Sequence, residues 1–262
     1  MNRLMAFIIG SFPMDGPFWI NFKKQILGLA YLFLHPPQLK RIIIREVRYG
    51  QRHQNRRVWL EWQAYDQYIA HLLHGTQESQ SRPLNVARIQ TILKMIHRLG
   101  NELDVLDVGC GAGVISEHIW KMGNHVTCAD LPTITSLTHK RRVLLVVTSD
   151  AEHLAFASDS FNVIIALEIL EHLWNPSIFL DEAYRILKPK GHLIIEVPEG
   201  KEGLRWDSHI QFFTIESLKK LPGTRFDVSE VKRLKAVAGV PTPTIILDLC
   251  KSTNKASAAS LQ

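Results

Sequence analysis

The segment VLDVGCGAG, at residues 105–113, restricts the fold of this chain more than any other feature. Its first half is an apolar run typical of a buried strand, and glycine follows at positions 109, 111 and 113. Glycines at alternate positions let the backbone turn sharply and approach a ligand closely. Helical spacing begins at Val114, so free N–H groups of a helix N terminus are expected behind the loop, where they attract an anionic group. The dinucleotide fingerprint G-x-G-x-x-G is not met, because its third glycine would fall at Val114, and this argues against a dehydrogenase.

Short apolar runs alternate with helical patterns along the chain from about Asn85. Strands are predicted at Asp104–Val108, His125–Ala129, Val143–Val147, Asn162–Ala166, His192–Val197, Phe226–Leu234 and Thr244–Leu249. Helices are predicted from Asn85 to Gly100 and at Val114–Met122, Thr133–Arg142 and Ser177–Leu187. Such alternation indicates an α/β fold with a mostly parallel sheet and helices on both faces.

Acidic side chains stand where three of these strands end. Asp130 ends the second strand, where a carboxylate can accept two ribose hydroxyls. Asp150 follows the third strand, placed to contact an adenine amine, and the fourth strand runs into EILEH at residues 168–172.

The order of these motifs resembles that of the class I S-adenosylmethionine-dependent methyltransferases of the type-11 kind, which includes quinone-biosynthesis O-methyltransferases. The motifs are VLDVGCGAG, Asp130, SDAEHLAF, FNVIIALEILEHL and AYRILKPKGHLIIEVP. The resemblance covers about residues 85–250. It implies a Rossmann-like sheet of seven strands that ends in an antiparallel hairpin. It also implies that S-adenosylmethionine is bound by Asp107, Gly109, Gly111 and Gly113 at the methionine part, Asp130 at the ribose, Asp150 and Ala151 at the adenine, and Glu168 near the reactive end. Two positions depart from the usual pattern: Ala155 replaces a proline and Asn162 replaces an aspartate.

The candidate catalytic residues are Glu171, His172 and His209. Methyl transfer from a sulfonium needs alignment and a dry pocket, and an oxygen or nitrogen acceptor can also need a base. The pattern E-x-x-E-H with a distal histidine is also similar to the metal site of 3′-end small-RNA 2′-O-methyltransferases. Three interpretations therefore stay open: Mg²⁺ or Mn²⁺ held by Glu168, Glu171, His172 and His209, a histidine base without metal, or positioning alone.

The excess positive charge of the chain lies at its N-terminal end. Residues 1–60 hold ten Lys or Arg and two Asp or Glu, whereas the whole chain has a net charge of +6. Arginines recur every three to four residues from Arg41 to Arg56, so they share one face if this segment is helical. That face is interpreted either as exposed to solvent or as a stripe that contacts phosphate groups. The apolar stretch Ile26–Leu34 is too short to span a bilayer and fits a lid or core helix, an interfacial helix or an anchor.

These patterns predict three parts and one main activity. The parts are a basic, partly apolar helical extension at 1–84, a methyltransferase domain at 85–250 and a disordered tail at 251–262. The extension is expected to act as a lid, to select the acceptor, or to contact an anionic membrane through residues 1–60. The three cysteines are far apart, which favours a reducing, cytoplasmic compartment, peripheral to a membrane if that contact exists.

A small-molecule acceptor with an oxygen nucleophile is expected. An RNA 2′-O-methyltransferase is disfavoured because residues 61–262 are slightly acidic and carry no added RNA-binding motif. A nonenzymatic S-adenosylmethionine-binding module is the third alternative, although Asp107, Asp130 and the glycines are all retained.

Overall fold

The computed structural model describes residues 83–131, 144–200, 209–235 and 243–253. The predicted N-terminal extension up to residue 82, the helix at Thr133–Arg142 and the tail from residue 254 lie outside the described residues, so these assignments stay predictions. The predicted boundaries are wrong by two or three residues, because a helix already begins at Pro83, the last strand continues to Lys251 and Ser252 is buried. Within the described ranges, no helix is both long and apolar enough to cross a lipid bilayer.

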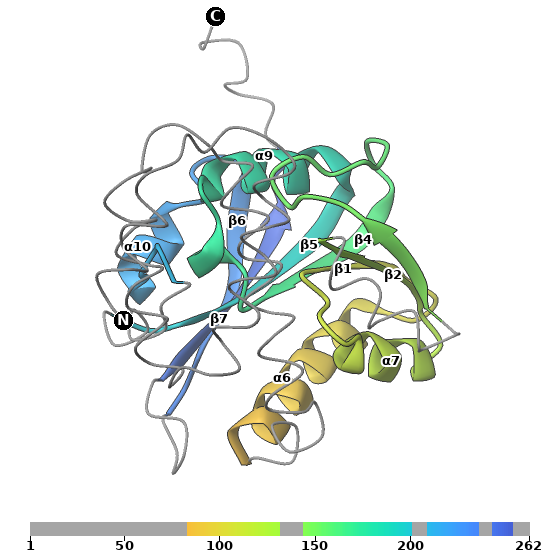
Figure 1. The fold of residues 1–262 in the computed structure, drawn as a ribbon, viewed down its shortest axis with the longest axis horizontal. Coiled ribbons are helices and arrows are strands. Elements are labelled where there is room, and N and C mark those ends of the chain that lie inside the picture. The colour runs from red at the N-terminus through yellow and green to blue at the C-terminus, as the bar shows by residue number, and fades with distance from the viewer. Residues whose placement is uncertain (1–82, 132–143, 201–208, 236–242, 254–262) are drawn as a thin grey trace, which may run out of the picture. The chain divides into compact units, whose positions relative to one another are not determined.

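Seven strands form one sheet in the order β3-β2-β1-β4-β5-β7-β6 (Figure 1). Their bounds are β1 Asp104–Val108, β2 His125–Asp130, β3 Leu145–Thr148, β4 Phe161–Leu167, β5 Leu187–Pro198, β6 Phe226–Leu234 and β7 Thr244–Lys251. Strands β1 to β5 run parallel to one another, and β7 runs antiparallel to both β5 and β6. The predicted α/β fold with a final antiparallel hairpin is therefore confirmed, although β5 begins earlier than expected, at Leu187, which pairs with Phe161.

The helices connect and cover these strands. Their bounds are α6 Pro83–Leu99, α7 Val114–Lys121, the 3₁₀ turn η1 Leu170–His172, α9 Pro176–Ile186 and α10 Ile215–Lys220. The α6 helix ends before Gly100, whose φ of 135° suits only glycine. The α9 helix starts where the Asn175 side chain accepts a hydrogen bond from Ser177 N, with proline at the first helical position. Sequence patterns missed α10, whose start is fixed by a reciprocal cap between Thr214 and Ser217.

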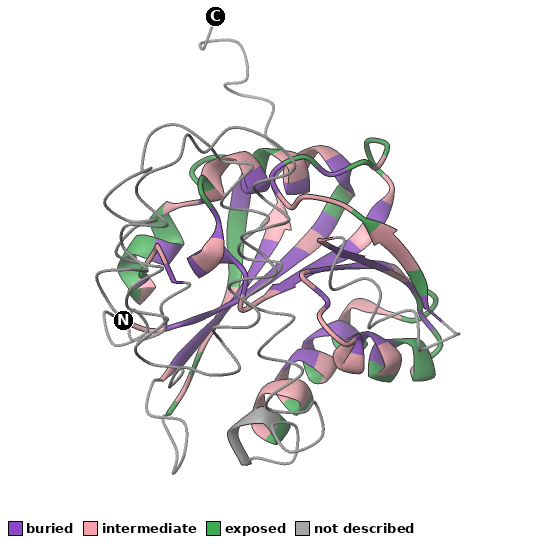
Figure 2. Cartoon of the chain, in the orientation of Figure 1, coloured by how far each residue is buried: buried purple, intermediate pink, exposed green. Residues whose placement is uncertain are grey.

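Alternate residues of the strands feed two apolar cores, one on each face of the sheet (Figure 2). On one face Val105 of β1 packs in the same core as Ile92 and Met95 of α6 and Ile119 of α7. On the other face Leu106 shares a core with Phe179 and Leu180 of α9 and Leu218 of α10. Neighbouring strand residues point to opposite faces, so a parallel sheet needs a helical layer on each side, as predicted.

Candidate functional site

The candidate site lies at the carboxyl ends of β1, β2 and β4. The chain crosses from β1 to β2 on one side and later returns to place β4 on the other side of β1. Loops that leave neighbouring strands in opposite directions at such a point open a crevice, which is where α/β sheets bind ligands.

The glycine loop between β1 and α7 is folded tightly against β2 and the start of the β4–α9 connection. Gly109 has φ 76° and donates its N–H to the carbonyl of Ala129 over 2.8 Å. A Cβ atom at Gly109 would lie 2.1 Å from Cγ2 of Ile169, so only glycine fits there. Gly113, with φ 70°, is the N-cap residue of α7 and provides no side-chain cap. The first N–H groups of α7 therefore remain available to an anionic ligand group.

Asp107 lies at the base of the loop and is almost fully buried. Its carboxylate accepts a hydrogen bond from the hydroxyl of Ser116, in the first turn of α7. Burial raises the pKa of Asp107 to about 7, while the Ser116 hydrogen bond acts in the opposite direction. The side chain is thus close to the balance between its neutral and charged forms at neutral pH.

Asp130, the last residue of β2, faces the same loop. One carboxylate oxygen accepts the N–H of Gly111 over 2.8 Å, and the other accepts the N–H of Leu131 over 2.7 Å. Burial raises the pKa of Asp130 to about 6, and the two backbone hydrogen bonds oppose this increase. The structure therefore brings the predicted ribose-binding acid directly against the glycine loop.

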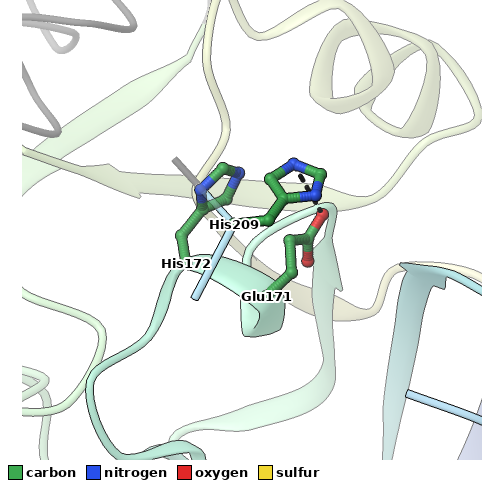
Figure 3. Close-up of side chains that lie close together, drawn as sticks. All are labelled: Glu171, His172 and His209. Atoms are coloured by element: carbon green, nitrogen blue, oxygen red, sulfur yellow. Dashed lines mark ion pairs between the residues drawn. The ribbon is translucent and has the colours of Figure 1, made fainter. Parts of the chain in front are cut away.

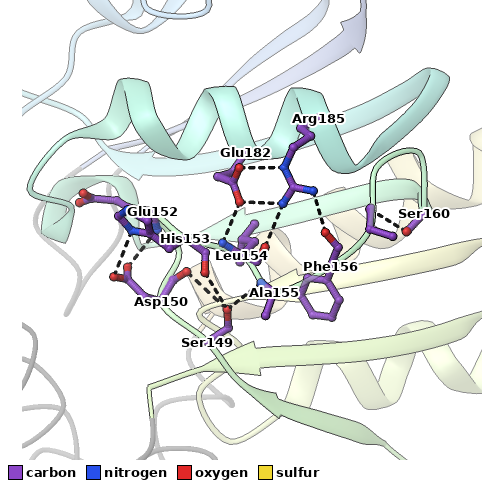
Figure 4. A network of polar contacts seen from close by, with 11 residues as sticks. Ser149, Asp150, Glu152, His153, Leu154, Ala155, Phe156, Ser160, Glu182 and Arg185 are labelled. Atoms are coloured by element: carbon purple, nitrogen blue, oxygen red, sulfur yellow. Dashed lines mark hydrogen bonds and ion pairs between the residues drawn. The ribbon is translucent and has the colours of Figure 1, made fainter.

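The loop after β3 carries Asp150 and Ala151 and is attached to α9 (Figure 4). Asp150 Oδ1 accepts the N–H of Glu152 over 3.0 Å, and Ala151 packs against the apolar core on the α9 side. Arg185 of α9 donates to the carbonyl of Phe156 over 2.7 Å. These contacts give the loop a fixed shape before any ligand binds.

Two residues of α9, Glu182 and Arg185, hold this loop and were missed by sequence reasoning. Glu182 Oε2 accepts the N–H of Leu154 over 2.9 Å, and Arg185 lowers the pKa of Glu182 by hydrogen bonding to its carboxylate. Their i, i+3 spacing on a predicted helix was the available signal. Ala155, which replaces the usual proline, donates its N–H to Ser149 Oγ over 3.4 Å, a bond that proline could not make.

Glu168 follows β4 in a left-handed conformation, with φ 58°. Its carboxylate lies 3.8 Å from the guanidinium of Arg88 on α6. Arg88 Nη2 also donates to Glu196 Oε2 over 2.7 Å, and Glu196 is fully buried in β5. Burial raises the pKa of Glu196 to about 7 although Arg88 opposes this. Neither Arg88 nor Glu196 was identified from the sequence.

Glu171, His172 and His209 converge beside this group (Figure 3). One ligand atom from each residue lies within 4.8 Å of the others, and His209 Nε2 is 4.0 Å from Glu171 Oε1. The two imidazole rings meet edge to face with centroids 4.7 Å apart. Among the side chains that the structure describes, Glu168 is not part of this convergence, because it faces Arg88 instead.

Backbone hydrogen bonds explain how residues so far apart in sequence meet. The carbonyl of Glu171, in η1, accepts the N–H of Ile210 over 2.8 Å and that of Gln211 over 3.0 Å. The Glu171 side chain is buried, and neither of its oxygens has a hydrogen-bond partner among the described residues. Burial, together with the neighbouring carboxylates of Glu168 and Glu196, raises the pKa of Glu171 well above its usual range.

Comparison with known proteins agrees with this architecture. Residues 106–195 match the model of a family described as "Methyltransferase domain". This part of the chain thus resembles a methyltransferase domain. The matched part runs from β1 into β5 and includes the glycine loop, Asp130, Glu171 and His172, whereas His209 lies beyond it.

Relatives and solved structures resemble parts of the chain. A protein of Xylella fastidiosa named "Ubiquinone biosynthesis O-methyltransferase" is 33% identical over 129 residues, which is 47% of this chain and 51% of that protein. A protein of the same name from Agrobacterium fabrum is 36% identical over 102 residues, 36% of this chain and 40% of its own length. The chain thus spans about half the length, or less, of these relatives.

The N-methyltransferase NodS of Bradyrhizobium japonicum, solved with S-adenosyl-L-homocysteine, has a fold similar to that of this chain. Its TM-score is 0.62 at 18% identity, over 72% of this chain and 98% of that one.

Proposed function

We propose that this chain transfers a methyl group from S-adenosylmethionine to an oxygen atom of a small-molecule acceptor. The observation that carries the proposal is the pair of buried carboxylates, Asp107 and Asp130, on two sides of a glycine loop at the ends of β1 and β2. The relatives named as ubiquinone biosynthesis O-methyltransferases support an oxygen acceptor.

The residues around the loop fit the donor molecule. Asp130 is oriented by two backbone N–H groups and keeps lone pairs for two ribose hydroxyls. Asp107 complements an ammonium group, and the uncapped N terminus of α7 complements a carboxylate. In the same proposal Asp150 and Ala151 contact the adenine and Glu168 lies near the reactive end. When bound, S-adenosylmethionine supplies a methyl group that is already activated on a sulfonium.

His209 is proposed to take the proton of the acceptor hydroxyl. Its Nε2 atom lies 4.0 Å from Oε1 of the buried Glu171. The imidazolium formed by this proton transfer would in turn favour the ionised form of Glu171, which burial opposes. His172 packs edge to face on His209 and limits the orientations of that ring. The burial of Glu171 and His209 keeps water away from the transferred proton.

The same three side chains fit a divalent cation. Two buried carboxylate oxygens of Glu171 without hydrogen-bond partners among the described residues, next to two imidazoles, are a suitable donor set for Mn²⁺ and an adequate one for Mg²⁺. Glu171, His172 and His209 would hold the ion, which would lower the pKa of a bound hydroxyl. This candidate differs from the histidine base in one respect that can be measured, which is sensitivity to a chelator.

Calorimetric titration with S-adenosylmethionine tests the donor site. Asp130→Asn is expected to weaken binding by at least about tenfold, because an amide replaces one acceptor oxygen by a donor toward the ribose. Asp181→Asn is the matched control, since Asp181 is exposed on α9 and pairs with Arg225. Equal affinities of the two variants would contradict the ribose assignment, and failure of the wild type to bind would refute the proposed function.

Transfer of a radiolabelled methyl group tests the reaction and the acceptor class. The acceptors are a catechol such as 3,4-dihydroxybenzoate, a primary amine and a short RNA, each with and without EDTA. Label in the catechol alone is the expected result, and His209→Ala is expected to reduce kcat with little change in affinity for the donor. Loss of activity with EDTA that added Mn²⁺ restores would establish the cation. Donor binding without transfer to any acceptor would favour a nonenzymatic module.

A further inference from the structure

A chain of three buried side chains lies under the glycine loop and is not explained by the fold alone. Ser116 of α7 donates its hydroxyl proton to Asp107 of β1, and Cys128 of β2 donates its thiol proton to Ser116 Oγ over 3.2 Å. Ser116 and Cys128 are fully buried and Asp107 nearly so. The three residues come from three different elements, β1, α7 and β2.

The direction of these hydrogen bonds follows from the chemistry of the groups. A serine hydroxyl has one proton, and here that proton points at the carboxylate, so the oxygen is left to accept from the thiol. Hydrogen bonds in such a series polarise one another, and a hydrogen bond to a carboxylate is stronger than one to a neutral acceptor. Cys128 stands opposite Asp107 in the β1–β2 register, which explains why both reach the same hydroxyl.

The groups around Asp107 act on its charge in opposite directions. The titratable and polar groups that face Asp107 are Asp130 and Cys128 from β2, Cys110 from the glycine loop and Ser116 from α7. Burial and the Asp130 carboxylate both favour the neutral form of Asp107 and raise its pKa, while Ser116 lowers it. Among the described residues that face Asp107, Ser116 favours the carboxylate by donating a hydrogen bond to it.

We propose that Ser116 is a positioning residue of the donor site, which, supported by Cys128, orients Asp107 and favours the carboxylate that receives the ammonium group of S-adenosylmethionine. This inference rests on the proposed function. It assigns a role to two residues, Ser116 and Cys128, that do not themselves contact the donor. It also predicts that the Ser116 hydroxyl, which does not itself ionise in this pH range, sets the pH at which donor affinity is lost through its hydrogen bond to Asp107.

The test is the pH dependence of the dissociation constant for S-adenosylmethionine, measured by calorimetry from pH 5.5 to 8.5. Affinity in the wild type is expected to fall as pH decreases, because protonation of Asp107 removes the charge that attracts the ammonium group. In Ser116→Ala the pKa of Asp107 rises, so the same fall is expected at higher pH. At pH 7 the loss of affinity is expected to be about tenfold or more, the usual effect of one hydrogen bond to a charged group.

Controls separate this role from packing. Ser252→Ala removes a buried serine far from the glycine loop in sequence, at the end of β7, and is expected to leave the pH profile unchanged. Cys128→Ala keeps the Ser116 hydroxyl and is expected to shift the pH profile in the same direction by a smaller amount. This variant also tests the proposal if Ser116→Ala does not fold.

The possible outcomes are distinct. A uniform loss of affinity at all pH values, or no loss, in variants that remain folded would overturn the role of Ser116 while leaving the proposed function intact. A wild type that does not bind S-adenosylmethionine at any pH would overturn both.

Discussion

Replacing Gly109 with alanine should destabilise the protein through one identifiable collision. The residue has φ 76°, a conformation that costs an L-amino acid about 1–2 kcal/mol. The added Cβ would also lie 2.1 Å from Cγ2 of Ile169, far inside the usual contact distance of about 3.5–4.0 Å. Ile169 is itself buried and has little room to move, so overpacking should add about 1–3 kcal/mol. The expected total is about 2–5 kcal/mol.

Gly123→Ala provides the matched control for this prediction. Gly123 has a similar φ of 89°, but no atom lies within 4 Å of its added Cβ, so only the backbone term of about 1–2 kcal/mol applies. The free energy of unfolding in urea is the measurement, together with the affinity for S-adenosylmethionine. The double variant Gly109→Ala/Ile169→Ala should be less unstable than the sum of its single changes, because the collision is removed. Equal losses in the two glycine variants, or additivity in the double variant, would refute the reasoning.

Three further predictions concern charged groups. Arg88→Met should lower the free energy of unfolding by about 3–5 kcal/mol because it leaves Glu196 buried without its cation, and Arg88→Met/Glu196→Leu should recover much of that loss in urea titrations. Asp107 has a pKa raised from 3.8 to about 7 in the folded state, so its favourable contribution is complete below about pH 4 and is lost as pH rises to about 7. As pH rises through that window, the free energy of unfolding of Asp107→Asn should therefore increase relative to that of the wild type, by up to roughly 1.4 kcal/mol per pH unit. A difference between the two proteins that stays constant with pH would contradict the burial of an ionisable group. Arg185→Ala should speed hydrogen exchange of the Leu154 amide by about tenfold, because Glu182 loses the partner that orients it, and an unchanged rate would show that the loop does not depend on α9.

Local patterns were sufficient to predict most of the sheet and the donor side of the site. The β1 strand and the glycine loop lie within ten residues of each other, and Asp130 could be placed because it ends an apolar run. Parallel strands bring their carboxyl ends to one edge, so acids that follow different strands were expected to meet there. Their hydrogen bonds, such as Gly111 N to Asp130, depend only on that shared edge.

Contacts between distant elements could not be predicted in this way. Glu196 lies inside the apolar run LIIEVP, and a charged residue in such a run indicates a buried partner of opposite charge. That partner, Arg88, lies 108 positions earlier on α6, so no local pattern connects the two residues. One of the three interpretations of the sequence placed Glu168 with Glu171, His172 and His209 around a metal ion. The left-handed backbone of Glu168, which a non-glycine residue rarely adopts, turns its carboxylate toward Arg88 instead.

The contacts between α6 and the sheet limit how far the chain can be shortened for study. A fragment that begins at residue 106, where the family match starts, would lose Val105 and would expose Val163 and Ile165 of β4, which share a core with Ile92, Met95 and Ile96. It would also leave Glu196 buried without Arg88. Ending at residue 195 would remove β7, and with it the antiparallel neighbour of β5. Excised versions intended for crystallography or domain grafting should therefore retain residues 83–253 as one piece.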